Sequence, residues 1–391
     1  MILMQTKAIF IDAYRELNAK KLFWLTMVLN LLAVAIFASI GINERGTTLL
    51  HWTFDSQIMN TNFFEKEFYY KNQFTGLGVR FWLSWVSAIL ALVSTAGLIP
   101  DMVSSGTIEP MLSKPIGRAR LFITKYATGL LFVGLQVLVF TLGCFIVMGV
   151  RAGAWEPRMF LAVPIVIVFF SYIFSFCAFV GLITRSTITA LLLTCIFWSS
   201  LFVIQMGEGT VNMFNVSAQI TMEDRLEEVQ EYEDEARLRI ETLRETNEPI
   251  PGEDGAPLPR EAADSLEAVY PYLATARKEL ASSEKGSATW SSWNNRIIFL
   301  KTILPKTGDT LSLLKRNLVS EDAMTKMVNA QLDNQQEYNE EDMPAFADPR
   351  VARRIHETQV THSTFWIIGT SLIFEAVLLG LCLVIFIRRD F

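Results

Sequence analysis

The sequence predicts an all-α polytopic membrane protein with six transmembrane helices and a large helical extracytoplasmic insertion between spans five and six. Hydrophobic residues make up 51% of the 391 positions. They cluster in six runs, each close to the roughly 20 residues that a helix needs to cross a bilayer. The runs are residues 22–41, 81–99, 127–150, 160–183, 188–206 and 364–387. Buried helices of a large soluble protein are a much weaker explanation, because such helices rarely run this far without a charge.

The first span is expected to be a retained anchor. Lys20 and Lys21 precede an apolar run that is longer than the 7 to 15 residues usual for a signal core. In the fourth run Pro164 stands near the start, where a helix tolerates proline. Only residues 184–187 separate the fourth and fifth runs, so we expect these two spans to form a tight helical hairpin.

The short loops predict the orientation. With the N-terminus in the cytosol, the inside segments hold 11 Lys and Arg residues and the short outside segments hold 6. Basic residues favour the cytosolic side, so both termini are expected there. The chain then divides into a membrane domain at 1–206 with a cytosolic coupling loop at 100–126, an extracytoplasmic helical domain at 207–363, and a sixth span with a cytosolic tail at 364–391.

The outer domain is expected to contain a coiled-coil hairpin. Apolar residues recur at heptad-like spacing at Leu226, Val229, Ala236, Ile240 and Leu243, and again at Ala262, Leu266, Val269, Leu273, Ala276 and Leu280. The connector at 247–260 has four prolines and two glycines, which end helices. Pro271 should kink the second helix or mark its true start. Residues 207–363 carry a net charge of −12.

An aromatic segment lies between the first two spans. Residues 43–80 include Trp52, Phe54 and Phe63, with charged residues between the aromatic ones. Two interpretations remain open and equally weighted: an amphipathic piece on the outer leaflet, or an ordinary packed loop.

The segment GTIEPMLSKPIGRARLFITKY at 106–126 is the most informative part of the chain. It is a polar, basic connector between two apolar runs, and a loop with only a linking role needs fewer residues. Its apolar residues Ile108, Met111 and Leu112 stand among cations, as in a surface that lies on another protein. We expect a cytosolic partner to bind here.

Catalytic and metal-binding motifs are absent from the sequence. It has no GxxxxGK[ST] loop for ATP, no GxSxG, no HExxH and no CxxC. We therefore expect a chain that is not itself an enzyme, has no metal and no cofactor of its own, and binds no nucleic acid. The polar residues within spans are few: Asn30, Gln136 and Glu375. An ionisable residue in a membrane is a candidate for function, and a protonated Glu375 bonded to a neighbouring helix is the equally weighted alternative.

Six spans with this loop after the second resemble the permease subunits of bacterial ABC-2 type ABC transporters. The resemblance rests on a pattern like sGT-E-LLS-PI-R---L--KY. The residues that match it are Ser105, Gly106, Thr107, Glu109, Met111, Leu112, Ser113, Pro115, Ile116, Arg118, Leu121, Lys125 and Tyr126. Ile108 and Pro110 differ from the commoner residues, and the RRDF ending is also similar. The resemblance covers the spans; the outer domain matches nothing we can name.

The resemblance implies a permease, by the family's usual habit an exporter, driven by a separate ATPase subunit that binds ATP. It implies two permease copies, as a homodimer or heterodimer, in the bacterial inner membrane. The loop would grip the ATPase through Gly106, Thr107, Ile108, Glu109, Met111, Leu112, Ser113, Lys114, Pro115, Arg118 and Lys125. Two other classes stay open: a membrane component that works an envelope partner through the outer hairpin, and a secondary carrier.

Overall fold

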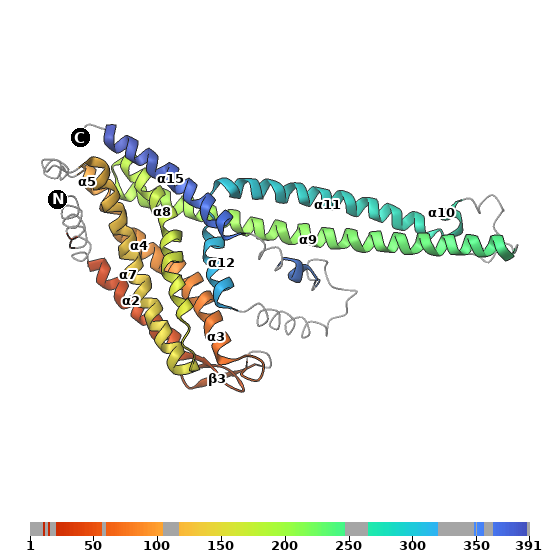
Figure 1. Cartoon of the computed structure of the whole chain (residues 1–391), viewed down its shortest axis with the longest axis horizontal. Coiled ribbons are helices and arrows are strands. Elements are labelled where there is room, and N and C mark those ends of the chain that lie inside the picture. Colours follow the sequence, from red (N-terminus) through yellow and green to blue (C-terminus); the bar gives the residue numbers. More distant parts are fainter. Residues whose placement is uncertain are drawn as a thin grey trace. The chain divides into compact units, whose positions relative to one another are not determined.

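The chain is described from a computed structural model that covers residues 11, 15, 21–56, 60–104, 117–246, 265–319, 348, 350–355 and 363–388 (Figure 1). It forms two compact units. Of the described residues, those up to 204 together with 301–319 and 363–388 belong to the first unit, and the others belong to the second. The division into 1–206, 207–363 and 364–391 stays a prediction. Residues 301–319, which that division assigned to the outer domain, cluster here with the spans.

Six helices among the described residues are long and apolar enough to cross a membrane, which confirms the predicted number. They are Lys21–Ser39, Lys66–Val103, Arg118–Ala152, Pro157–Thr184, Thr187–Thr242 and Thr364–Arg388. The protein is therefore a multi-pass helical membrane protein. Many large apolar side chains remain exposed on these helices, such as Leu31 on the first and Val203 on the fifth, as a surface in contact with lipid requires.

The first unit is a bundle around the α7–α8 pair. Helix α2 (Lys21–Ser39) packs on α7 (Arg118–Ala152), and α7 packs on α8 (Ala162–Thr184), which follows the short 3-10 helix η3 (Pro157–Leu161). Helix α15 (Thr364–Arg388) and the short α12 (Thr307–Leu318) both pack on α8. Phenylalanines of α8 fill the centre, since Phe169, Phe170 and Phe174 are at most 1% exposed.

The second span begins earlier than the sequence predicted. It runs through α3 (Lys66–Gln73), the π-helical η1 (Phe74–Ser87), α4 (Ala88–Thr95), the 3-10 turn η2 (Ala96–Leu98) and α5 (Pro100–Ser104). Residues 66–80, predicted as part of the outer segment, are thus helical. Tyr70 and Phe74 bury one face of this extension, while Lys71 pairs with Glu67 at 2.6 Å and with Glu156 at 2.7 Å. The charged side chains of these ion pairs lower the hydropathy of residues 66–80. Hydropathy alone therefore leaves these residues out of the span.

A small antiparallel sheet follows the first span. It consists of β1 (Ile40–Ile42), β2 (Gly46–Leu49) and β3 (Trp52–Asp55), in the order β1-β2-β3. The all-α prediction did not include it. The sheet lies at the end of the bundle where α2 ends and α3 begins (Figure 1). Ile42 joins the core of the first unit, so the sheet is fixed to the bundle through β1.

The fifth span continues without a break into the second unit. Helix α9 runs from Thr187 to Thr246, whereas the sequence predicted a span that ends at 206. Gly207 and Gly209 do not interrupt it, and no neighbouring atom lies within 4 Å of the Cβ that either would carry. A glycine within a helix destabilises it by only about 1 kcal/mol, so α9 can continue through both positions.

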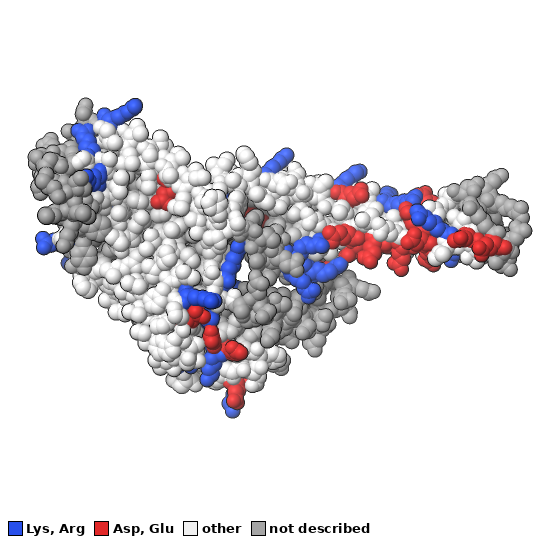
Figure 2. Space-filling view, viewed as in Figure 1, with Lys and Arg blue, Asp and Glu red and all other residues white. Residues whose placement is uncertain are grey.

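In the second unit α9 pairs with α11 (Tyr272–Ile303), which the one-turn α10 (Leu266–Val269) precedes. Helix α11 begins directly after Pro271, so this proline marks the start of the helix, which was one of the two predicted effects. The pairing is antiparallel: Val229, Leu273 and Ala276 form a buried cluster, and Phe214 stacks on Trp290 at 4.9 Å. Figure 2 shows acidic side chains gathered along the paired helices, while the spans are mostly uncharged in that view.

Candidate functional site

The predicted coupling loop is described only at its two ends. Helix α5 ends at Ser104 and α7 begins at Arg118, and residues 105–116 lie outside the described residues. The predicted contact residues Gly106, Thr107, Ile108, Glu109, Met111, Leu112, Ser113, Lys114 and Pro115 fall in that stretch. Their role therefore stays a prediction, and the site is built here from the helices that carry the loop.

Both ends of the loop are held by the ends of other spans. On the entry side, the Thr187 hydroxyl at the start of α9 donates to Asp101 Oδ1 at 2.7 Å. Gly181 of α8 lets Pro100 approach, because a Cβ there would lie 2.6 Å from the proline ring. On the exit side, Arg118 donates to the carbonyl oxygen of Ile387 at 3.1 Å. The residues that flank the loop are therefore in contact with other spans of the bundle.

The exit helix is joined to the last span by more than one contact. The ring of Phe122 lies 5.8 Å from that of Phe386, one turn further along α7 than Arg118. Lys125, predicted as a loop residue, lies in α7 and is 3% exposed. Its predicted contact with the ATPase stays a prediction.

Glu375 lies further into the bundle and bridges three helices. The Tyr126 hydroxyl of α7 donates to Glu375 Oε1 at 2.9 Å, and the Ser171 hydroxyl of α8 donates to Oε2 at 2.7 Å. Each hydroxyl also has a backbone acceptor in reach, the carbonyl oxygens of Ser171 and Val168 respectively. Both oxygens of a carboxyl that is 8% exposed are thus satisfied, as burial in an apolar bundle demands.

One turn away on α15 lies a second polar cluster, which the sequence analysis missed. Lys306, at the start of α12, is 2% exposed. Its backbone N–H donates to Ser371 Oγ at 3.0 Å, its ammonium donates to Thr370 Oγ1 at 2.5 Å, and that ammonium stands 4.3 Å from the centre of the Trp366 ring. The only sequence signal was a lysine directly after the apolar run that ends at Pro305.

Asn30 and Gln136, the other predicted polar residues, lie apart from Glu375. The Trp82 indole donates to Asn30 Oδ1 at 2.8 Å, which joins η1 to α2. Gln136 donates to Thr26 Oγ1 at 2.6 Å, which joins α7 to α2. Hydrogen bonds of this kind hold helices together in a bilayer, so we assign both residues to packing of the first span.

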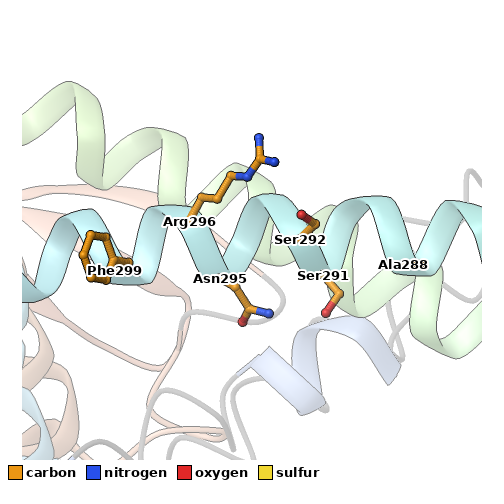
Figure 3. A pocket seen from close by; sticks show the side chains of 6 residues that line it. All are labelled: Ala288, Ser291, Ser292, Asn295, Arg296 and Phe299. Carbon is orange, nitrogen blue, oxygen red and sulfur yellow. The ribbon is translucent and has the colours of Figure 1, made fainter.

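A shallow hollow in the second unit offers less chemistry. It is lined by one stretch of α11, namely Ala288, Ser291, Ser292, Asn295, Arg296 and Phe299. Figure 3 shows their side chains spread along the outside of this helix instead of converging on one point. Sites for small molecules bring polar groups from several elements together, so we do not assign a ligand to it. Within the described residues, no three His, Cys, Asp or Glu side chains gather as a metal site would require.

These observations define a class: a six-span helical membrane protein whose loop ends are tied to neighbouring spans. The chain matches the model of the ABC-2 family transporter protein over residues 8–391 and belongs to this family. It is therefore the membrane component of an ABC transporter. Comparisons with curated proteins and with solved structures gave no match.

Proposed function

We propose that this chain is the permease of an exporter that a separate ATPase subunit drives through the loop at 105–116. The observation that carries the proposal is the fastening of the loop ends. Asp101 holds the start of α9, and Arg118 holds the end of α15. An ATPase that moves the loop would therefore move spans, as a rigid-body switch of access requires.

In this proposal both termini and the loop are cytosolic, and the second unit, with its helical hairpin, lies outside the bacterial inner membrane. The excess of basic residues in the short inside segments supports this orientation. The ATP belongs to the partner, and a second permease copy, identical or related, completes the transport path. Within the bundle, the Glu375 cluster would carry motion of α7 to α15 and α8.

The test replaces the apolar contact residues of the loop with acids. Met111→Asp with Leu112→Asp should abolish co-purification of the ATPase, because a charge placed in a buried apolar contact costs several kcal/mol. The matched control is Leu226→Asp with Leu238→Asp, two exposed apolar residues of α9. If the loop variant still co-purifies fully with an active ATPase, the loop is not the docking site.

A second candidate function uses the paired helices as a lever on an envelope partner. It is favoured by the separate compactness of the second unit and by the acidic stripe Glu227, Glu228, Glu231, Glu233, Asp234 and Glu235. Acidic residues disfavour contact with anionic lipid. Replacing 221–284 by a short Gly/Ser bridge discriminates the two. Loss of physiological output with ATPase binding retained supports the lever, and full output excludes it.

A further inference from the structure

One face of the small sheet carries apolar side chains on all three strands, with Thr47 as its one polar residue. The register sets Ile42, Thr47 and Phe54 opposite one another, and likewise Ile40, Leu49 and Trp52. Opposed residues, and residues two apart on a strand, share a face, so all six side chains lie on the same face. Within the described residues this face is covered at β1, where Ile42 is 7% exposed. It is open at β3, where Trp52 and Phe54 are 62% and 59% exposed.

The turn between β2 and β3 is held at the depth where the first span ends. The Leu50 N–H donates at 2.7 Å to the carbonyl oxygen of Ser39, the last residue of α2. Leu50 has a φ of 55° and is 67% exposed. A hairpin turn normally places glycine in that left-handed conformation. A leucine in this conformation is strained. Exposure of its side chain to water would provide no favourable contact to offset that strain.

The charged side chains of the sheet lie at its opposite end. Glu44 and Arg45 are exposed in the turn between β1 and β2. Asp55, also exposed, is opposed to Gly46 beside that turn. The sheet is thus polarised along its strands: the end at Ser39 carries Leu50, His51 and Trp52, and the far end carries the charges.

We propose that the sheet anchors the protein in the bilayer interface, with Leu50 and Trp52 seated between the lipid headgroups and the acyl chains of the leaflet in which α2 ends. The chain leaves no other depth for this turn, because β1 starts at the residue after α2 and Leu50 is bonded to Ser39. Tryptophan is the residue that this interface favours most clearly, and an apolar end with a charged far end fits the change from lipid to water. The anchor would fix the depth in the bilayer at which α2 ends and α3 begins.

The inference is tested on the full chain in lipid nanodiscs by depth-dependent quenching. Cys195 is replaced by Ala, since it is the exposed cysteine, and Cys144, Cys177 and Cys382 are buried. An environment-sensitive fluorophore is attached at Trp52→Cys and, as the matched control at the charged end, at Arg45→Cys. The quenchers are phosphatidylcholine with a nitroxide near the glycerol level, and aqueous iodide.

The expected result is that the lipid nitroxide quenches the label at 52 severalfold more than the label at 45, while iodide shows the reverse order. Equal iodide quenching at the two positions would overturn the proposal and leave the face open to a soluble partner. Protection of position 52 from both quenchers would also overturn it, in favour of a protein contact such as a second copy. His51→Cys repeats the test with Trp52 intact, and it must give the same order as position 52.

Discussion

Among single residues, Glu375 is the buried carboxyl that hydrogen bonds join to two neighbouring helices. Tyr126 and Ser171 donate to its two oxygens from two other helices. Yet each donor has a backbone carbonyl within reach when the carboxyl is removed. A buried donor is costly only when it is left without an acceptor, at about 1–3 kcal/mol. Stability and function at this position can therefore be separated.

We predict that Glu375→Leu leaves the thermal unfolding of the purified protein nearly unchanged and lowers the ATPase activity of the complex. The hydroxyls turn to their carbonyls, but the hydrogen bond between Tyr126 of α7 and Glu375 of α15 is lost. Tyr126→Phe should give a similar deficit, and the double variant should be no worse than either, because all three break one link. Wild-type ATPase activity in Glu375→Leu would contradict this prediction and show that the carboxyl serves only in packing.

The sequence predicted Glu375 as a functional candidate because a carboxyl in an apolar run is conspicuous. It could not predict Tyr126 or Ser171, since 249 and 204 positions separate them from Glu375 along the chain. Lys306 escaped for a different reason. It follows a proline outside every predicted span, and its hydrogen bonds go to Thr370 and Ser371 of the distant helix α15.

Among the elements, the pair α9–α11 depends on a few buried side chains. Leu273 is fully buried against Val229 and Ala276 in the described contact. Ion pairs beside it are partly exposed: Arg277 bonds Glu233 at 2.6 Å with side-chain exposures of 40% and 26%. Pairs of this kind contribute about 0–1 kcal/mol, so apolar burial dominates.

Leu273→Asp should separate the paired helices, because it places a charge in the apolar contact at a cost of several kcal/mol. Limited proteolysis of 205–300 then becomes fast. Leu238→Asp is the matched control, since Leu238 is 64% exposed and its replacement leaves the contact intact. Equal protease resistance of the two variants would mean that Leu273 does not hold the pair together.

The short helix at 350–355 packs on α9 within the second unit by two kinds of contact. Val351 is 2% exposed against Val216 and Ile220. Arg350 bonds both oxygens of Asp224 at 2.7 Å and also pairs with Asp348. Burial alone would raise the pKa of Asp348, but its bonds with Arg350 outweigh that effect and hold the pKa below the ordinary value.

We predict that Val351→Ala loosens this helix more than Arg350→Ala does. Losing two buried methyl groups costs about 1.5 kcal/mol. The ion pair that joins this helix to α9, between Arg350 and Asp224, is about half exposed and worth about 0.2–1 kcal/mol. The contribution of Asp348 is present above its unfolded pKa of about 3.9 and is lost as pH falls through the lower folded value. Both pH 6 and pH 8 lie above these pKa values. At either pH, hydrogen exchange of 350–355 should therefore be faster in Val351→Ala than in Arg350→Ala. A reversed ranking would make the ion pairs the main contact.

Element boundaries show where periodicity and hydropathy stop being sufficient. The six spans were predictable because a bilayer demands long apolar runs. The early start of the second span was not, since Lys71 and its acidic partners lower the local hydropathy. The sheet was missed because strands of three and four residues are too short for an alternation signal. For α9, the apolar run predicted only a span that ends at 206, whereas the helix continues to Thr246.

For the whole molecule, the central claim is that the loop after the second span grips an ATPase while the second unit lies on the other side of the membrane. A photo-crosslinking amino acid at Met111 in living cells tests it directly, with the same residue at Ser283 of α11 as control. We predict that position 111 crosslinks to a protein with a GxxxxGK[ST] loop and that position 283 never does. Such an ATPase crosslinked from position 283, or absent at position 111, would contradict the account.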